Sequence, residues 1–411
     1  MSRRWAIFAV TSLNFFLSQF YRASNAVIAP QLLQDLSLDT QGLGLISASF
    51  FYAFALTQIP LSILLDRIGP RRIMTALSLF GTLGAIIFSR ADSFSIGILG
   101  RILLGMGMSC NLMGTLKLLT TWFEPFRFAT LAGILFSIGT VGSMAATTPL
   151  VFLVQEIGWR QGFLLIAGIN FLLTIVLFLT VRDRPTTDPF GTASPDAPAG
   201  HPHPGPDLRL LLRKRDYWVI SIGTFVSYGV FASFQTLWAG PYLMEVIGLS
   251  AIGAGNLIFF MNVGTILGGP AWGALSDKLL KTRKEIVITG LLSMFFIMLG
   301  LMMLSQDSAL WVIVLLFFSF GLFRSSGPLM YAHIKELLPI GMAGTAMTGI
   351  NFFTMIGSAV FLQGMGSFMQ HFYPHASQGP EAFNAAFLLY AVCLAGTTLL
   401  YFLTKEKMGG S

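Results

Sequence analysis

The sequence predicts an all-α polytopic membrane protein, with twelve transmembrane helices in two pseudo-symmetric six-helix bundles around a central cavity. Composition, the number of long apolar runs and a match between the two halves of the chain predict this fold. Of 411 residues, 54% are hydrophobic and 10% are charged, against roughly 45–50% and about 25% in soluble domains. So few charged residues cannot cover a surface in water. In a bilayer, apolar side chains face lipid while helices satisfy their own backbone hydrogen bonds.

The apolar runs set the predicted helices. A helix needs about 20 residues to cross roughly 30 Å of hydrocarbon. The first run follows Ser2-Arg3-Arg4 and continues past Phe20 without a small-residue cleavage site, so we expect it to be retained as a span. The predicted spans are 5–33, 41–65, 72–90, 94–122, 128–154, 160–181, 216–244, 250–276, 285–305, 309–337, 341–370 and 380–403.

A change of composition divides the chain into two halves. Residues 186–206 are rich in Pro, Gly, Ala and Asp and have no helical period, which is typical of a flexible linker. Residues 207–215 form a short basic amphipathic segment suited to the headgroup surface. We therefore expect an N-terminal six-helix bundle at 1–183, a cytoplasmic linker at 184–215 and a C-terminal six-helix bundle at 216–411.

The loop charges predict the orientation. The net charge of +7 comes from Lys and Arg between the apolar runs, not from a basic patch on a soluble domain, so we expect no nucleic-acid partner. With the N-terminus inside, the outer loops hold only Arg90 and Arg160. We expect an integral protein of a bacterial cytoplasmic (inner) membrane, with both termini in the cytoplasm.

The two halves also match each other at a fixed offset of 211 residues, for example from position 30 to position 241. Proline, glycine and aspartate coincide without a gap across the first two spans of each half. Duplicated halves are typical of secondary transporters that bind substrate near the midplane. The matched pairs are Pro30 with Pro241, Leu38 with Leu249, Gly42 with Gly253, Gly44 with Gly255 and Asp66 with Asp277.

A charged loop motif follows the second span of each half. Residues 62–72 are SILLDRIGPRR, and residues 273–278 are GALSDK. The pair resembles the G-x-L-A-D-R-x-G-R-K/R motif of the major facilitator superfamily, with Ser62 where the family usually has Gly. A carboxylate beside Arg or Lys at a helix end can pair with a neighbouring helix in one state and release it in another. We therefore predict conformational gating by Asp66, Arg67, Gly69, Arg71, Asp277 and Lys278.

Two arginines lie near span centres, where a charged side chain costs ~3 kcal/mol even on insertion scales. They are Arg22 in the first span and Arg324 in the tenth, and no Asp or Glu lies near the midplane to neutralise them. Guanidinium groups match carboxylate or phosphate oxygens bidentately. The sequence therefore predicts that Arg22 and Arg324 bind an anionic group of the substrate.

Helical spacing adds residues to this site. Asn25 extends a polar stripe through Arg22, and Tyr331 shares a face with Arg324. In the fourth span Arg101 and Lys117 lie on roughly opposite faces, and we favour Arg101 as the one that faces the cavity. The predicted substrate-binding residues are Arg22, Arg324, Tyr21, Asn25, Arg101, Tyr228, Gln235 and Tyr331.

Three short segments, residues 21–30, 58–60 and 66–69, look like the organic-anion branches of the superfamily, which include the anion:cation symporters and organophosphate exchangers. In this resemblance Arg22 matches the span-one substrate arginine, and Arg101 matches the span-four arginine. Proton-coupled symporters of that branch carry a Glu seven residues after the latter. Here that position is Met108, so the resemblance implies no proton symport by that route.

These observations favour a secondary active transporter of small organic anions of the carboxylate type, working by alternating access. Two alternatives remain: a transporter of zwitterions such as amino acids or short peptides, and a transporter-like membrane sensor. We expect no enzyme, because the His and acidic residues are scattered and no nucleophile–base pair shares a segment. We expect a monomer in the bilayer without metal or cofactor. The coupling ion, if there is one, stays open.

Overall fold

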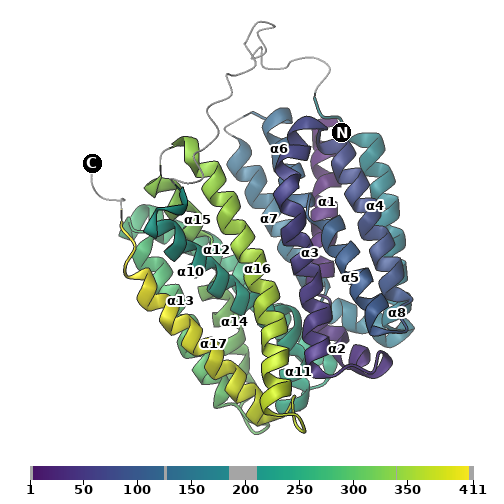
Figure 1. The fold of residues 1–411 in the computed structure, drawn as a ribbon, viewed down its shortest axis with the longest axis vertical. Coiled ribbons are helices and arrows are strands. Elements are labelled where there is room, and N and C mark those ends of the chain that lie inside the picture. The colour runs from purple at the N-terminus through teal and green to yellow at the C-terminus, as the bar shows by residue number, and fades with distance from the viewer. Residues whose placement is uncertain (1–2, 125–126, 185–210, 339, 407–411) are drawn as a thin grey trace, which may run out of the picture.

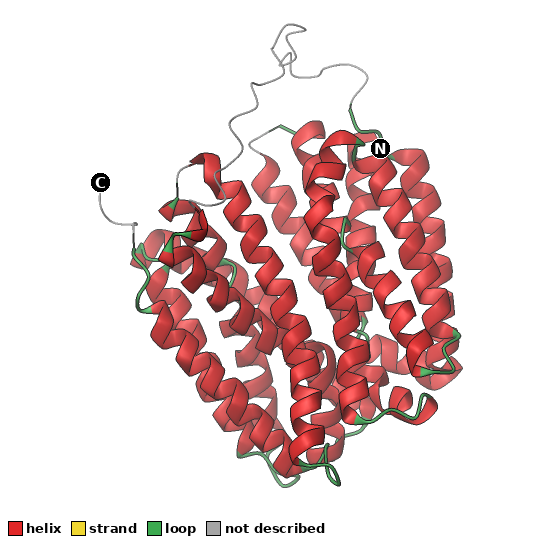
Figure 2. Ribbon diagram, in the orientation of Figure 1, coloured by secondary structure: helices red, strands yellow, loops and turns green. Residues whose placement is uncertain are grey.

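The computed structural model describes residues 3–124, 127–184, 211–338 and 340–406. Over these residues the chain is helical and contains no strand (Figure 2). Most of the predicted linker at 184–215 lies outside the described residues. The helices otherwise follow the predicted apolar runs, because a backbone in lipid must satisfy its hydrogen bonds within the segment.

In the N-terminal part, three of the predicted spans are interrupted. The first changes from α1 to α2 at Ser24, and the fourth from α5 to α6 at Ser109 and Cys110. The fifth stops at Ala145 and resumes at Thr148, and the same helix then turns at Gly158 (φ 77°) before the sixth predicted span. The helices are α1 (Arg3–Ala23), α2 (Asn25–Asp35), α3 (Thr40–Arg67), α4 (Pro70–Ser89), α5 (Phe94–Met108), α6 (Asn111–Trp122), α7 (Phe128–Ala145) and α8 (Thr148–Thr180).

The C-terminal part has corresponding irregularities. The seventh predicted span contains two π-helical turns, whose wider hydrogen-bonded rings often occur at functional sites. The tenth span is interrupted between Arg324 and Leu329, next to Pro328, which lacks a backbone N–H. The elements are α10 (Arg215–Ser233), η2 (Phe234–Trp238), α11 (Ala239–Pro241), η3 (Tyr242–Val246), α12 (Ala251–Ala274), η4 (Leu275–Leu280), α13 (Lys284–Met302), α14 (Leu310–Arg324), α15 (Leu329–Leu337), α16 (Ile340–Phe372) and α17 (Pro380–Tyr401).

Within the described residues, 10 helical stretches are long and apolar enough to cross a membrane, which identifies an integral membrane protein. The two predicted spans outside this set, 5–33 and 128–154, are the interrupted runs α1–α2 and α7–α8. The stretches are Thr40–Leu61, Pro70–Ser89, Phe94–Trp122, Thr148–Thr180, Arg215–Val246, Ala251–Asp277, Lys284–Met302, Leu310–Leu337, Gly349–Phe372 and Pro380–Tyr401.

The N-terminal and C-terminal helices lie on opposite sides of the molecule, with α3 and α16 side by side between them (Figure 1). The first and last described residues lie at the same end of the molecule. At the other end α2 contacts η2 and α11, and α12 contacts α7 and α8. We call the end that carries the termini the terminal end, and the opposite end the far end.

Glycines permit the closest helix contacts, as is common in membranes. Where α4 crosses α5, a β-carbon on Gly84 would lie 2.5 Å from the backbone nitrogen of Leu104. Across the two parts of the chain, a β-carbon on Gly366 would lie 2.5 Å from the carbonyl oxygen of Thr40, and one on Gly240 would overlap the carbonyl oxygen of Ala26. The two parts therefore meet backbone to backbone at the far end.

Polar side chains continue this contact along α3 and α16. The hydroxyl of Thr40 on α3 lies 2.6 Å from that of Ser377 in the loop after α16, and the Tyr52 hydroxyl on α3 donates to Gln363 on α16 at 2.9 Å. Further toward the terminal end, the Asn351 amide donates to the Gln58 side chain at 2.7 Å. These contacts form a polar seam between α3 and α16.

Candidate functional site

The site is built where two interrupted helices end inside the membrane. Arg22 lies in the last turn of α1, and Arg324 is the last residue of α14. A helix C-terminus carries partial negative charge from its free carbonyl groups, so it stabilises a nearby cation. The interruptions at Ser24 and after Arg324 therefore provide local support for two charges that apolar surroundings alone would disfavour.

Tyr228 of α10 connects the two arginines. Nη1 of Arg22 donates to the Tyr228 hydroxyl at 2.9 Å. The guanidinium carbon of Arg324 lies 4.7 Å from the centre of the same tyrosine ring and 4.9 Å from that of Phe231. One phenol thus contacts an arginine from each part of the chain, with its oxygen and its ring face respectively.

Aromatic faces hold the arginines in place of carboxylates. The guanidinium carbon of Arg22 lies 5.6 Å from the ring centre of Phe51 and 5.0 Å from that of Phe54, both on α3. Among the described residues, neither Arg22 nor Arg324 has an acidic partner within salt-bridge distance, and Nε of each is buried without a hydrogen-bond partner. The site therefore has two uncompensated positive charges and free donors, an arrangement suited to an anion.

The sequence prediction did not include Phe51 and Phe54, although the aromatic run at 50–54 (FFYAF) offered a signal. An arginine stacks on an aromatic face through the negative charge of the ring surface, without any polar residue that would mark the contact. Such contacts are therefore invisible to a search for charged or polar partners.

Three other predicted residues lie in hydrogen bonds between neighbouring helices. Asn25 donates to the Ser47 hydroxyl at 2.8 Å, and Gln235 donates to Asn262 at 2.7 Å. The Tyr331 hydroxyl lies 2.8 Å from that of Thr354 and 3.3 Å from Oδ1 of Asn351. Through Asn351, Tyr331 joins the polar seam between α3 and α16.

Arg101 and Tyr21 are not brought into the Arg22–Tyr228–Arg324 group. Both side chains are completely buried, with exposures of 0%. Nη1 of Arg101 donates to the backbone carbonyl of Tyr21 at 3.1 Å, and the Tyr21 ring packs against Phe163. Lys117, on the other face of the fourth predicted span, donates to the carbonyl of Leu65 at 2.7 Å.

The first charged motif begins α4. Gly69 precedes α4 with φ 96°, a conformation that favours glycine, and the Asp183 carboxylate lies where a β-carbon would project. Asp183 accepts from the backbone N–H of Arg71 at 2.7 Å, and Nε of Arg71 donates to the carbonyl of Phe178 at 2.9 Å. Arg67 is exposed, and the side chain of Asp66 lies outside the described part.

The second motif forms an ion-pair cluster. Arg283 lies 2.5 Å from Asp277 and 3.1 Å from Glu336 of α15. Burial lowers the pKa of Arg283, but hydrogen bonds to Glu336 and Asp277 outweigh it and raise that pKa above its ordinary value. The side chain of Lys278 lies outside the described part. The described contacts of both motifs stay within their own part of the chain, so cross-pairing by the gating residues stays a prediction.

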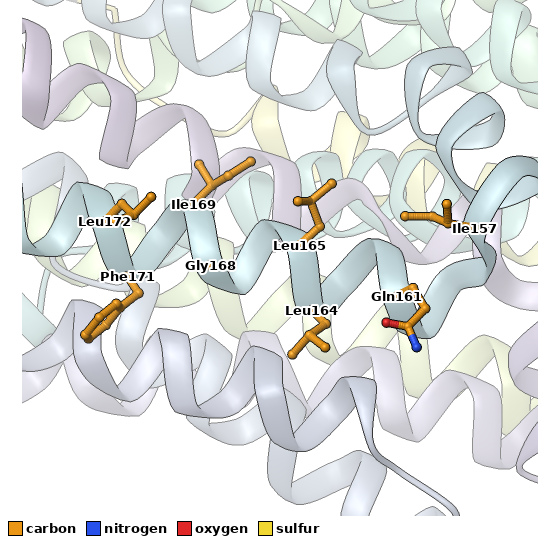
Figure 3. A pocket seen from close by; sticks show the side chains of 8 residues that line it. All are labelled: Ile157, Gln161, Leu164, Leu165, Gly168, Ile169, Phe171 and Leu172. Carbon is orange, nitrogen blue, oxygen red and sulfur yellow. The ribbon is translucent and has the colours of Figure 1, made fainter.

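An apolar hollow lies away from this chemistry, along the outer side of α8 (Figure 3). Its lining includes Gln161 but is otherwise apolar, and several of its residues are exposed to the surroundings of the helix. Such a surface suits lipid chains, not an anion. The lining residues are Ile157, Gln161, Leu164, Leu165, Gly168, Ile169, Phe171 and Leu172.

A helical integral membrane protein in which two buried arginines, without an acidic partner among the described residues, meet at one tyrosine is suited to hold an anionic solute. Residues 11–362 match the family model of the Major Facilitator Superfamily. The match covers most of the chain, so the chain belongs to this superfamily. The resemblance inferred from the loop motifs is thereby confirmed.

Three curated relatives are named as probable transporters of organic acids. The chain is 25% identical over 378 residues to a probable sulfoacetate transporter of Cupriavidus necator, covering 87% of this chain and 86% of that protein. It is 25% identical over 394 residues to a probable galactarate/D-glucarate transporter of Bacillus subtilis, covering 87% and 84%. A probable galactarate/D-glucarate transporter of Escherichia coli is 24% identical over 430 residues, covering 97% and 92%.

Solved structures support the same fold. A bacterial homolog of the human lysosomal transporter Spinster, in an inward-facing and occupied conformation, gives a TM-score of 0.76 at 20% identity, covering 98% of this chain and 97% of that chain. A D-xylose-proton symporter gives 0.75 at 15% identity, covering 96% and 97%. At these identities the likeness concerns the fold alone.

Proposed function

We propose that this protein is a secondary active transporter of small organic anions of the carboxylate type, binding them between Arg22 and Arg324. The arrangement that carries the proposal is the shared contact of both arginines with Tyr228, without an acidic partner in the described part. A monovalent anion leaves the group with a net positive charge, whereas a dianion neutralises it. The acids named for the relatives, sulfoacetate and galactarate or glucarate, are dianions at neutral pH.

In this proposal the chain forms twelve spans in two bundles, 1–183 and 216–411, with both termini in the cytoplasm. The Tyr228–Arg22 hydrogen bond and the polar seam join the bundles. The described contacts run from the far end as far as Gln58 and Asn351, a distribution that supports a conformation closed at the far end. Alternating access then separates the far-end contacts and closes the terminal end around the same arginines.

A zwitterionic substrate has less support, because its ammonium group needs an anionic or carbonyl partner. The arginines have aromatic neighbours instead, and an ammonium group beside two guanidinium groups would be repelled. We therefore favour transport of small organic anions of the carboxylate type across a bacterial inner membrane.

The test is uptake by purified protein in lipid vesicles, with D-glucarate, sulfoacetate, alanine and glucose as labelled solutes in parallel. We expect saturable uptake of at least one anion, abolished by Arg22→Gln and by Arg324→Gln but not by the exposed-loop control Arg90→Gln. Saturable uptake of alanine or glucose that survives both substitutions would refute the anion assignment. Binding without uptake of any solute would favour a sensor.

A further inference from the structure

Arg101 is a completely buried cation whose surroundings contain no acidic partner in the described part of the chain. Its guanidinium carbon lies 5.0 Å from the ring centre of Phe50 on α3 and 5.7 Å from that of Phe88 on α4. Its described hydrogen bond goes to the backbone carbonyl of Tyr21. A buried charge requires compensation, and here a backbone dipole and two ring faces supply it.

The accepting carbonyl belongs to the last turn of α1, one residue before Arg22. Ser24, where the helix is interrupted, also donates its hydroxyl to this carbonyl at 3.1 Å. The Tyr21 oxygen therefore accepts from Ser24 and from Arg101 at the negative end of α1. A charge-assisted hydrogen bond at this point fixes the turn that carries Arg22.

The helix that provides Arg101 is itself held closely. One turn along α5, a β-carbon on Gly105 would overlap the carbonyl oxygen of Phe50, so α5 and α3 are in backbone contact. Gly100, next to Arg101, also packs closely, because a β-carbon there would lie 2.7 Å from the backbone nitrogen of Phe88 on α4. The part of α5 that carries Arg101 therefore cannot shift far unless α5 separates from α3 and α4.

We propose that Arg101 is a positioning residue: through the Tyr21 carbonyl it fixes the last turn of α1 and thereby the direction in which Arg22 enters the substrate site. The inference rests on the proposed function for the role of Arg22, but its geometric content does not depend on any substrate. In this proposal Arg101 acts through the Tyr21 carbonyl and does not contact the anion. Replacing Arg101 should therefore shift residue 22 while the overall fold is kept.

The experiment measures the accessibility of position 22 directly. In a background with Cys110→Ser and Cys393→Ser, Arg22→Cys is treated with a charged thiol reagent in purified protein. Adding Arg101→Met, which keeps an apolar side chain of comparable length, should change the modification rate by about 10-fold, the effect of losing one charge-assisted hydrogen bond. Arg101→Lys, which keeps a donor and the charge, should give a smaller change.

Leu104→Met is the matched control, since Leu104 is also completely buried on α5 and lacks a polar contact with α1. It should leave the rate within about twofold of the parent. Separately, Arg101→Cys should react at least about 10-fold more slowly than Arg22→Cys, because residue 101 is completely buried.

An unchanged rate at position 22 with Arg101→Met would overturn the proposal. If that variant does not fold, an unchanged rate with Arg101→Leu, which also removes the donor and the charge, would do the same. Rapid modification of Arg101→Cys, slowed by D-glucarate, would instead place Arg101 in contact with substrate. Failure of the wild-type protein to take up any anion would count against the proposed function alone, since the Arg22→Cys rates without ligand would still report the position of α1.

Discussion

Replacing Arg22 with Lys tests the anion site while keeping the charge. In the structure Nη1 of Arg22 is occupied by the Tyr228 hydroxyl, which leaves the rest of the guanidinium fork for a ligand. Lysine carries its three donors on a single nitrogen and has no planar fork, so it cannot keep the contact with Tyr228 and also bind the anion bidentately. The loss of one charge-assisted hydrogen bond should weaken anion binding by about 1–3 kcal/mol, or ~10- to 100-fold.

The assay is equilibrium binding of D-glucarate and sulfoacetate to purified, correctly folded protein. Arg324→Lys should show a loss of the same order, and Arg22→Gln a larger one. Arg90→Lys, at an exposed position, is the matched control and should bind as the wild type does. Wild-type affinity in both Arg22→Lys and Arg324→Lys would refute the reasoning. The transporter assignment would remain, without an argument for an anion.

Three further predictions concern gating, coupling and pH. Asp277→Asn removes an ion pair with Arg283 away from the site, so the transport rate should fall while binding affinity changes less than about twofold; unchanged turnover at equal expression would count against gating. An imposed proton gradient alone should drive little uptake into vesicles, whereas internal unlabelled anion should accelerate it; strong gradient-driven uptake without exchange would contradict this. At the far end, hydrogen bonds from Trp159 and Arg160, together with the Arg160 charge, outweigh burial and lower the pKa of Asp35. Its stabilising contribution is therefore present above the ordinary carboxyl pKa and lost as pH falls through the lowered one, so thermal melting should show a steeper acid decline for wild type than for Asp35→Asn.

The sequence predicts the helical apolar segments well, because hydropathy distinguishes segments that favour lipid from segments that favour water. It does not predict the interruptions at Ser24 and at Ala146–Thr147, since helix breaks inside a membrane depend on which neighbouring groups satisfy the freed backbone. Hydropathy therefore predicts where the chain is helical and apolar more readily than whether each apolar run is one continuous helix.

The candidate site shows the same limit. The charge of Arg22 and Arg324 inside apolar spans selects these two residues, helical spacing adds Tyr228, and the structure brings the three together. Periodicity also favours Arg101, but a helical face reveals only which residues share a side of the helix, not which neighbour that side meets. Here the neighbours are Phe50, Phe88 and the Tyr21 carbonyl, contacts that require the packing of three other helices.

The backbone contact between Gly240 and Ala26 limits how the far end can open. A side-chain gate can open by rotating about a single bond, but two touching main chains must move apart as whole helices. A single added methyl group at Gly240 would overlap the Ala26 carbonyl oxygen and act as a wedge between the two parts of the chain. Gly240→Ala would thus disfavour the far-end contact between the two parts of the chain without touching either arginine. In the proposed transport cycle, this one methyl group would favour the state that is open at the far end, so that this state can be studied by itself.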